Sequence, residues 1–248
     1  MDTHGAYDFK VRSYECSKYG IATLPTICNY LQEAASLSAE ELKFSKSNFA
    51  ESGNNISWVL TRLRVKMSRY PRWGENVCVL TFPRGGRKIT AWRDFVLYGS
   101  GGSDEVIGCA TSEWMIIDLS TRKIVPVPQR VFALANTERE PVLGTSPFAP
   151  KLKFPESGTA CRMEFKAQNS HIDLNGHVNN SHYVEWLMEP FEGGMANEFE
   201  IVFRSETFAG EKVVLEVAKD DDGVSMHRVS SADGETHAIA RISPAAAP

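Results

Sequence analysis

The sequence lacks any long hydrophobic segment and any paired-cysteine motif. No apolar stretch approaches the roughly 18 residues that a membrane-spanning helix needs, and residues 1–10 contain no apolar core typical of a secretory signal peptide. The five cysteines are scattered, odd in number and never spaced as CxxC, which indicates free thiols in a reducing compartment and argues against a zinc site. We therefore expect a cytoplasmic protein with no membrane span and no bound metal.

The sequence is also short of positive charge, with a formal net charge of −4 over 248 residues. Because it contains no nucleic-acid recognition motif either, this balance argues against binding to DNA or RNA. The charge is uneven, however, since residues 60–94, here called the basic belt, contain nine Lys or Arg side chains and only two acidic ones. Such a belt is suited to docking an acidic partner, but the solvated outer faces of strands would have the same composition.

A proline-rich segment divides the chain into two similar halves. Five prolines lie between residues 127 and 160, which is typical of a linker on the surface. Each half combines one stretch with apolar residues at helical spacing and several stretches in which apolar and polar residues alternate, as in half-buried strands. We therefore predict an α+β fold of two helix-wrapped antiparallel sheet units: an N-terminal unit at residues 1–130, a linker at 131–158 and a C-terminal unit at 159–248.

The same periodicity predicts where the elements lie. One helix is expected in each half, near residues 24–35 and 180–189. Segments with the glycine, serine or aspartate residues typical of turns, at residues 84–87, 99–104, 220–223 and 232–235, are expected to separate the strands. The expected strands are at residues 58–67, 76–82, 88–98, 106–118, 160–165, 199–204, 212–218, 225–230 and 237–242.

The two halves align weakly along their length. Residues 72–80 lie over residues 208–216, and residues 29–31 of the first expected helix lie over residues 182–184 of the second. On this alignment the first half has apolar or neutral residues where the second has ionisable or amide side chains: Gly20, Ala22, Leu24 and Tyr70 stand opposite Asp173, Asn175, His177 and Glu206. We therefore expect one catalytic unit, and one unit that shapes a pocket or a docking face.

A short polar segment immediately precedes the second expected helix, whose N-cap is Asn179. It contains Asp173, Asn175 and His177. A carboxylate and an imidazole can accept a proton from water, and the free N–H groups at the start of a helix can stabilise an oxyanion. The arrangement is suited to hydrolysing an activated acyl group. Clusters of Asp, Asn, Gly and His also form ordinary turns before helices, so the spacing alone leaves both interpretations open.

Several motifs along the chain resemble those of the acyl-acyl carrier protein (acyl-ACP) thioesterases of plants and bacteria. They occur in the family's order over nearly the whole length: Arg-Ser-Tyr-Glu at 12–15, Trp-Val-Leu-Thr-Arg at 58–62, Arg-Tyr-Pro-Arg-Trp-Gly at 69–74, Trp-Arg-Asp at 92–94 and Asn-Gly-His-Val-Asn-Asn at 175–180. The resemblance implies a tandem (double) hotdog fold. It also implies hydrolysis of a long- or medium-chain acyl-ACP to a free fatty acid, which ends fatty acid synthesis, with no cofactor beyond the phosphopantetheine that the substrate carries.

The resemblance further implies the catalytic residues, which are Asp173, Asn175, His177 and Glu206. In this interpretation Glu206 and His177 activate water, Asn175 positions it, and Asp173 assists them or is itself the base or nucleophile. Many plant members have a cysteine after the glutamate, where this chain has Thr207, so we expect water rather than a thiol to attack the thioester. Strand alternation alone would leave Glu206 in solvent, unless the strand ends or bulges after Arg204.

Two sets of residues are expected to meet the substrate. The acyl chain is expected to enter the N-terminal unit beside residues that would equally suit a plain core: Leu24, Ile27, Cys28 and Leu31. The acidic ACP is expected to dock on the basic belt: Arg62, Arg64 and Lys66, with Arg69, Arg84, Arg87, Lys88 and Arg93 as further candidates. The alternatives are an acyl-CoA thioesterase on the same fold and a non-catalytic acyl-binding module. We expect either a monomer whose two units mimic a dimer, or a homodimer.

Overall fold

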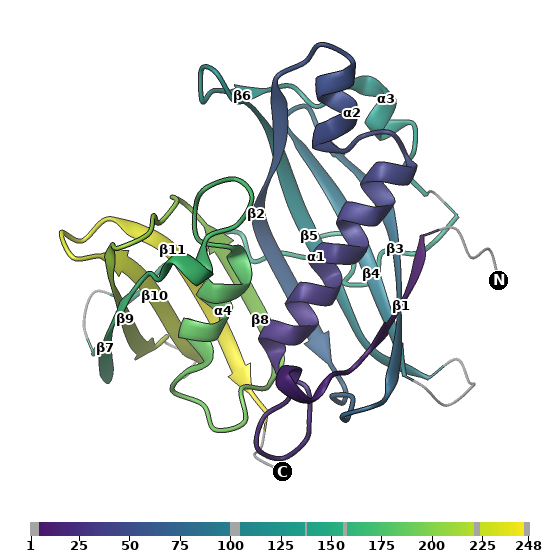
Figure 1. Ribbon diagram of the computed structural model, residues 1–248. Helices are drawn as coiled ribbons and strands as arrows, with labels where there is room; N and C mark the ends of the chain where they lie inside the picture. Colours follow the sequence, from purple (N-terminus) through teal and green to yellow (C-terminus); the bar gives the residue numbers. More distant parts are fainter. Residues whose placement is uncertain (1–4, 100–104, 137, 156–157, 221–223, 246–248) are drawn as a thin grey trace.

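One antiparallel sheet wrapped by two helices forms the protein (Figure 1). The computed structural model describes residues 5–99, 105–136, 138–155, 158–220 and 224–245. The helices are α1 (Leu24–Glu41), α2 (Lys46–Glu51), α3 (Gln129–Phe132) and α4 (Asn180–Met188). The strands are β1 (Ala6–Lys10), β2 (Ile56–Met67), β3 (Asn76–Arg87), β4 (Thr90–Gly99), β5 (Val106–Asp118), β6 (Ile124–Val125), β7 (Cys161–Lys166), β8 (Ala196–Phe203), β9 (Lys212–Lys219), β10 (Ser225–Ser231) and β11 (Thr236–Pro244).

The strands repeat one topology twice. Their spatial order is β1-β3-β4-β5-β2 in the N-terminal unit and β7-β9-β10-β11-β8 in the C-terminal unit, with β6 paired to β5. In each unit the long helix lies between the first and second strands of the sequence. The units meet where β2 and β8 pair antiparallel, with Leu63 opposite Ile201. The predicted α+β fold of two helix-wrapped antiparallel units is therefore confirmed, and the sheet continues from one unit into the other.

Backbone hydrogen bonds define which residues of the two units correspond. The loop before each long helix is tied in the same way to the segment that precedes the third strand of its unit: Ala22 N–H donates to the Pro71 carbonyl at 2.9 Å, and Val178 N–H to the Thr207 carbonyl at 2.8 Å. Tyr70 and Glu206 each stand one residue before the acceptor. Their predicted correspondence is confirmed.

The predicted register of the helices is wrong by about one turn. The bond from Asp173 N–H to the His177 carbonyl, at 2.9 Å, has its counterpart between Ser17 and Ile21, at 2.8 Å. The residues opposite Asp173, Asn175 and His177 are consequently Ser17, Tyr19 and Ile21. A shift of three or four residues keeps the apolar faces of two helices superposed, so periodicity could not reveal the error. Even so, only one copy of the loop combines a carboxylate with an imidazole.

Both long helices pack on the same core. α1 begins after Thr23 with Pro25 in its first turn, where a missing N–H leaves no donor unpaired. Its residues Ile27 and Leu31 are almost fully buried, as is Leu187 of α4, and each such side chain contributes about 1.5–3 kcal/mol on burial. One hydrophobic cluster contains residues from both helices and from the inner faces of both sheet halves. The two units therefore share a single core.

The segment at residues 84–87 is a continuation of β3 rather than the predicted turn. Glycine marks bulges as well as turns, and here the pairing with β4 shifts between Pro83 and Gly85. Gly86 has φ +155, and an added Cβ would lie 2.1 Å from the Thr90 carbonyl oxygen, so the close approach of β3 and β4 requires glycine. The expected turns at residues 99–104 and 220–223 lie almost entirely outside the described residues.

The segment between the units crosses the face of the sheet away from α1 and α4. Ala149 N–H donates to the Glu200 carboxylate at 3.0 Å, and Val142 N–H donates to Asp94 at 3.1 Å. Leu152 is buried against Met226 and Ile239. The division of labour predicted for residues 1–130 and 159–248 stays a prediction. Among the described helices, none has the length and apolar character needed to cross a bilayer.

Candidate active site

Asp173 and His177 lie on a tight loop that immediately precedes α4. A carboxylate oxygen of Asp173 accepts the Asn175 N–H at 2.7 Å, and the Asp173 carbonyl accepts the Gly176 N–H at 3.0 Å. Gly176 has φ +86, which residues with a Cβ rarely adopt. The segment is thus an Asn-Gly turn stabilised by its own aspartate. This turn places the carboxylate of Asp173 beside the imidazole of His177.

Glu206 reaches the loop because β8 ends before it. The strand stops at Phe203, so the alternation that would send Glu206 into solvent no longer applies. The bond between Val178 N–H and the Thr207 carbonyl joins the neighbours of His177 and Glu206. Two residues that are 29 positions apart in the sequence are thereby held face to face.

The imidazole of His177 lies between two carboxylates. Its Nδ1 is 3.9 Å from Asp173 Oδ1, and its Nε2 is 3.6 Å from Glu206 Oε1. The three side chains are 20% (Asp173), 23% (His177) and 29% (Glu206) exposed, so water can reach all of them. These separations are longer than hydrogen bonds, and catalytic hydrogen bonds commonly tighten when substrate binds. The arrangement can accept a proton from a water molecule placed between His177 and Glu206.

Two cations from the N-terminal unit touch this constellation. Lys46 of α2 donates to Asn175 Oδ1 at 3.1 Å, and the Asn175 amide nitrogen is 3.3 Å from Asp173 Oδ2. Arg122, in the turn between β5 and β6, forms an ion pair with Glu206 Oε2. The site is therefore assembled from both units, although its carboxylates and imidazole all come from one.

The start of α4 is capped as predicted, but fewer of its N–H groups are free than expected. Asn179 Oδ1 accepts the Ser181 N–H at 2.9 Å, and the Asn179 carbonyl accepts that of His182 at 3.0 Å. Val178 and Tyr183, which flank the cap, are both buried, as a hydrophobic staple requires. Among the described residues the N–H of Asn180 has no such partner. It is the first-turn donor best placed to meet a substrate oxygen.

The hydroxyl of Thr207 is not presented as a nucleophile. Thr207 is fully buried, and its Oγ1 accepts from the Tyr183 hydroxyl at 2.8 Å and lies 3.2 Å from His237 Nδ1. Burial raises the pKa of Tyr183 to about 12, so this phenol stays neutral at neutral pH. The hydroxyl that stands where the resemblance led us to compare a cysteine is thus engaged by hydrogen bonds inside the sheet.

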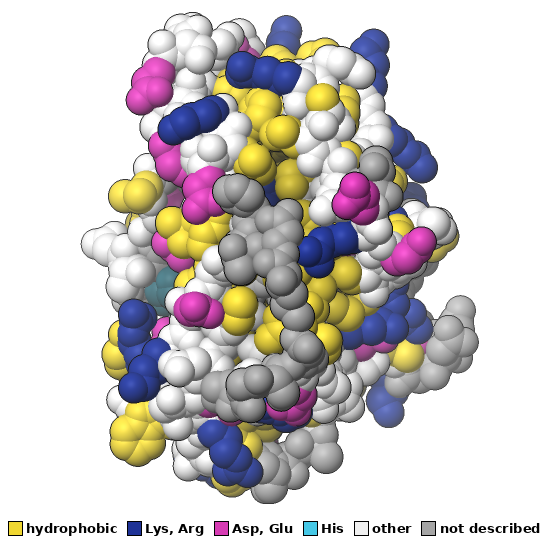
Figure 2. Space-filling model, turned by 90° about the vertical axis from the view of Figure 1, so that its right-hand side faces the viewer, with side chains coloured by type: hydrophobic (Ala, Val, Ile, Leu, Met, Phe, Trp, Pro, Cys, Tyr) yellow, Lys and Arg dark blue, Asp and Glu magenta, His cyan; other side chains and the backbone are white. Residues whose placement is uncertain are grey.

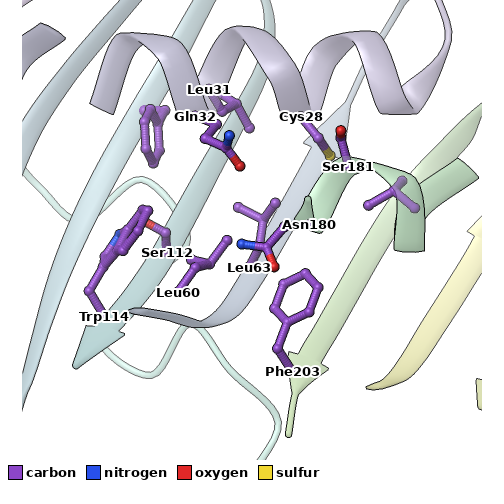
Figure 3. A pocket seen from close by; sticks show the side chains of 12 residues that line it. Cys28, Leu31, Gln32, Leu60, Leu63, Ser112, Trp114, Asn180, Ser181 and Phe203 are labelled. Atoms are coloured by element: carbon purple, nitrogen blue, oxygen red, sulfur yellow. The ribbon is translucent and has the colours of Figure 1, made fainter. Parts of the chain in front are cut away.

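An apolar pocket opens between the two units next to the start of α4. Figure 3 shows that α1, β2, β5, α4 and β8 all contribute to its wall, and that Asn180 and Gln32 point toward its centre from opposite sides. Most of the lining is hydrophobic. The lining residues are Cys28, Leu31, Gln32, Leu60, Leu63, Phe95, Ser112, Trp114, Asn180, Ser181, Val184 and Phe203.

The expected acyl-chain residues divide into two groups. Cys28 and Leu31 line the pocket, whereas Leu24 and Ile27 have no exposed surface and belong to the shared core instead. All four side chains share one face of α1 by the helical period, so the sequence could not distinguish the two that line the pocket from the two that are closed off in the core. Burial raises the pKa of the Cys28 thiol to about 12, so it remains protonated and is no candidate nucleophile.

Most of the basic belt is engaged by partners within the fold, and docking of an acidic carrier on it stays a prediction. Arg62 pairs with Glu200 at 2.5 Å, Arg64 pairs with Glu198, and Lys66 approaches the same Glu198 at 3.3 Å. Other basic residues of the belt are also engaged: Arg69 with Glu75 and Glu105, Arg84 with Asp94, and Arg93 with Ser38 and Thr81. Alternation predicted that Arg62, Arg64 and Lys66 face away from the core, but not that they meet carboxylates.

The exposed remainder of the belt is small: Arg72, Arg87 and Lys88. On the molecular face that carries β1, Figure 2 shows Lys and Arg side chains interspersed with acidic and hydrophobic ones rather than gathered in one field. In the part of the chain that the structure describes, no three His, Cys, Asp or Glu side chains group as metal ligands would.

Sequence comparison identifies the family. Residues 4–135 match the acyl-ACP thioesterase N-terminal domain, and residues 156–243 match the acyl-ACP thioesterase C-terminal domain. The chain belongs to the acyl-ACP thioesterase family. It is 33% identical over 199 residues to oleoyl-acyl carrier protein thioesterase 1 of Arabidopsis thaliana, an alignment that covers 73% of this chain and 53% of the relative. It is 30% identical over 192 residues to the palmitoyl-acyl carrier protein thioesterase of Gossypium hirsutum, covering 73% and 46%.

The chain spans about half the length of these curated relatives. Both are named as chloroplastic, so a cytoplasmic location for this acyl-ACP thioesterase family member stays a prediction. Two solved structures share its fold with a TM-score of 0.82: an acyl-ACP thioesterase from Bacteroides thetaiotaomicron, 22% identical with 96% of each chain covered, and the 12:0-ACP thioesterase from Umbellularia californica, 21% identical with 96% and 95% covered. The predicted double hotdog fold is thereby confirmed.

Three residues that contact the site of this acyl-ACP thioesterase family member had no signal in the sequence. Lys46 and Arg122 reach it from the other unit, over 129 and 84 positions of sequence, and nothing local distinguishes them from surface cations. Gln32 looks like a polar residue on the outer face of an amphipathic helix. Only for Asn180 was a signal present, because it is the last residue of the Asn-Gly-His-Val-Asn-Asn motif and the first of α4.

Proposed function

We propose that this protein hydrolyses the thioester of a long- or medium-chain acyl-ACP and releases the free fatty acid. The observation that carries the proposal is the imidazole of His177 held between two carboxylates, beside an apolar pocket that begins at the N-terminus of α4. Family membership supports the same reaction. An acyl chain in the pocket would place its thioester near Asn180, at the end of the pocket next to the catalytic loop.

The proposed reaction uses water as the nucleophile. Water gives a proton to the His177–Glu206 pair as its oxygen bonds to the thioester carbon. The carbon–sulfur bond then breaks, and the pair returns the proton to the departing sulfur, so that the products are a carboxylic acid and the thiol of phosphopantetheine. Asp173 stabilises the imidazolium that forms transiently, because its carboxylate lies on the opposite side of the ring.

Two further groups would support this reaction. The N–H of Asn180 would donate to the developing oxyanion, where the positive end of the helix dipole adds to the effect. The side chain of Asn175 is engaged by Asp173 and Lys46, so we assign it to holding Asp173 rather than to positioning water.

The carrier is tested by comparing one acyl group on two thiols. Acyl-ACP substrates from about C8 to C18 and the matching acyl-CoA thioesters would be assayed for release of free thiol. We expect a higher kcat/KM on ACP, and the difference should shrink as salt is added, since screening weakens attraction to an acidic carrier. The exposed cations Arg72, Arg87 and Lys88 are the residues of the basic belt left to receive it.

The same assay separates the alternatives. Equal or faster hydrolysis of the CoA series would identify an acyl-CoA thioesterase and contradict the carrier assignment. Tight binding of acyl-ACP with no thiol released would identify a non-catalytic acyl-binding module. A kcat/KM on acyl-ACP that does not change with salt concentration would argue against docking through cations.

The pocket predicts which substitution changes chain-length preference. Leu31 lines the pocket, so Leu31→Phe should remove the space taken by the last part of the chain. Excluding roughly two methylene groups at about 0.8 kcal/mol each would lower kcat/KM for the longest good substrate by about tenfold. Shorter substrates should be hydrolysed at nearly the wild-type rate. The measurement is a chain-length profile of kcat/KM.

Leu37→Phe is the matched control, because Leu37 lies on the same helix and is 40% exposed. This variant should keep the wild-type profile. A uniform loss at all chain lengths in Leu31→Phe would indicate general damage to the core and would contradict the placement of the acyl chain.

A further inference from the structure

Arg122 occupies a backbone position that does not suit it. It lies in the turn between β5 and β6, which the Asp118 carboxylate organises by accepting the N–H groups of Ser120 at 2.9 Å and Thr121 at 2.7 Å. Arg122 has φ +58, and only Lys43 shares a positive φ among the described non-glycine residues. Glycine would adopt this conformation without the steric strain of a Cβ. A strained residue that keeps a long side chain suggests that the side chain has a task.

The side chain of Arg122 reaches a catalytic carboxylate of the other unit. Its guanidinium forms an ion pair with Glu206 Oε2, while the second oxygen of the same carboxylate, Oε1, faces His177 Nε2 at 3.6 Å. The Arg122 side chain is 56% exposed, and an ion pair so accessible to water adds little to folding stability. The ion pair therefore acts by orienting the Glu206 carboxylate, because it fixes which oxygen points toward the imidazole.

We infer that Arg122 is a positioning residue through which the N-terminal unit completes the catalytic site of the C-terminal unit. One oxygen of the Glu206 carboxyl group is bound by the guanidinium, and the other is left to share a proton with His177. Without Arg122 the Glu206 side chain can rotate, and the proton acceptor is correctly placed for only part of the time. This inference rests on the proposed thioester hydrolysis.

Three variants of Arg122 test the inference. Arg122→Gln should lower kcat by about 10- to 100-fold, as expected for a misplaced catalytic group, and leave KM nearly unchanged. Arg122→Lys should recover part of the rate, because an ammonium keeps the charge but not the planar fork. Arg122→Gly should lose as much rate as Arg122→Gln, yet have an equal or higher Tm, since glycine relieves the strain. Loss of activity without loss of stability is a result that a structural role would not produce.

Lys123→Gln is the control, because Lys123 is the exposed neighbour in the same turn and should be replaceable at no loss of rate. Adding Arg122→Gln to Glu206→Gln should cause no further loss, because Arg122 acts through Glu206. Full activity in Arg122→Gln, a further loss in the Glu206→Gln background, or a rise in KM at constant kcat would overturn the inference. Wild-type protein that hydrolyses no thioester would instead overturn the proposed function, so the two failures are distinguishable.

Discussion

Replacing His177 with alanine is expected to lower kcat by about 10²–10⁴-fold, the range of a positioned general acid–base group. The imidazole stands between Asp173 and Glu206, and no other described imidazole contacts either carboxylate. Folding should be little affected, because the His177 side chain is 23% exposed and its one hydrogen-bond contact is Nδ1 to the Val178 carbonyl at 3.3 Å. Initial rates of thiol release from acyl-ACP and the Tm of each variant are the measurements.

His182→Ala is the matched control for this prediction. His182 lies on α4, packs against His171 with tilted rings whose centroids are 4.5 Å apart, and pairs with Glu185. It should keep the wild-type kcat. Asp173→Ala should also lose most of the rate, because the charge that stabilises the imidazolium is removed. Wild-type turnover in either the His177 or the Asp173 variant would refute the catalytic assignment.

Replacing Glu200 with leucine is expected to destabilise the fold by about 3–5 kcal/mol, as for other buried ion pairs from which one partner is removed. Glu200 is 6% exposed and Arg62 17%, and Arg62 would keep its charge without a counter-ion. Ala149 N–H, which donates to the same carboxylate, would lose its acceptor as well. Urea unfolding monitored by circular dichroism measures the change in the free energy of unfolding.

Two comparisons sharpen this test. The double variant Arg62→Met with Glu200→Leu should recover most of the lost stability, because no unpaired charge remains. Glu164→Gln removes one partner of the exposed Arg162–Glu164 pair and should change stability by less than about 1 kcal/mol. Equal effects of Glu200→Leu and Glu164→Gln would contradict the buried-pair interpretation. If stability were unchanged in Arg62→Met and only carrier binding were lost, Arg62 would be a docking residue after all.

Periodicity predicted both long helices and, in the right order, nine of the strands, but it missed β1, α2, β6 and α3. The alternation in β5 gave its bounds at Val106 and Asp118, and the cap at Asn179 gave the start of α4. It failed where one residue type serves two local structures, as at Gly85, which makes a bulge inside β3 rather than a turn at its end.

The candidate site has a part that neighbouring residues encode and a part that depends on tertiary packing. Its local part, from Asp173 to Asn180, could be predicted because the turn and the cap are encoded by neighbouring residues. Its distant part could not, because contacts such as Arg122 with Glu206 depend on where strands end and how the units pack. The charge pattern of β2 likewise does not predict ion pairs, because a paired arginine such as Arg62 and a solvated arginine occupy equivalent positions in an alternating sequence.

The antiparallel pairing of β2 with β8 joins two similar units within one polypeptide. In a dimer of identical chains every substitution is made twice, so a bulky apolar residue at the position of His177 would erase both catalytic loops at once. Covalent linkage removes that constraint. Ile21 can stand in the first loop where the second has His177, and Tyr70 where the second has Glu206. Among the described residues the candidate catalytic side chains occur in one unit alone, an asymmetry that a symmetric dimer of identical chains could not have.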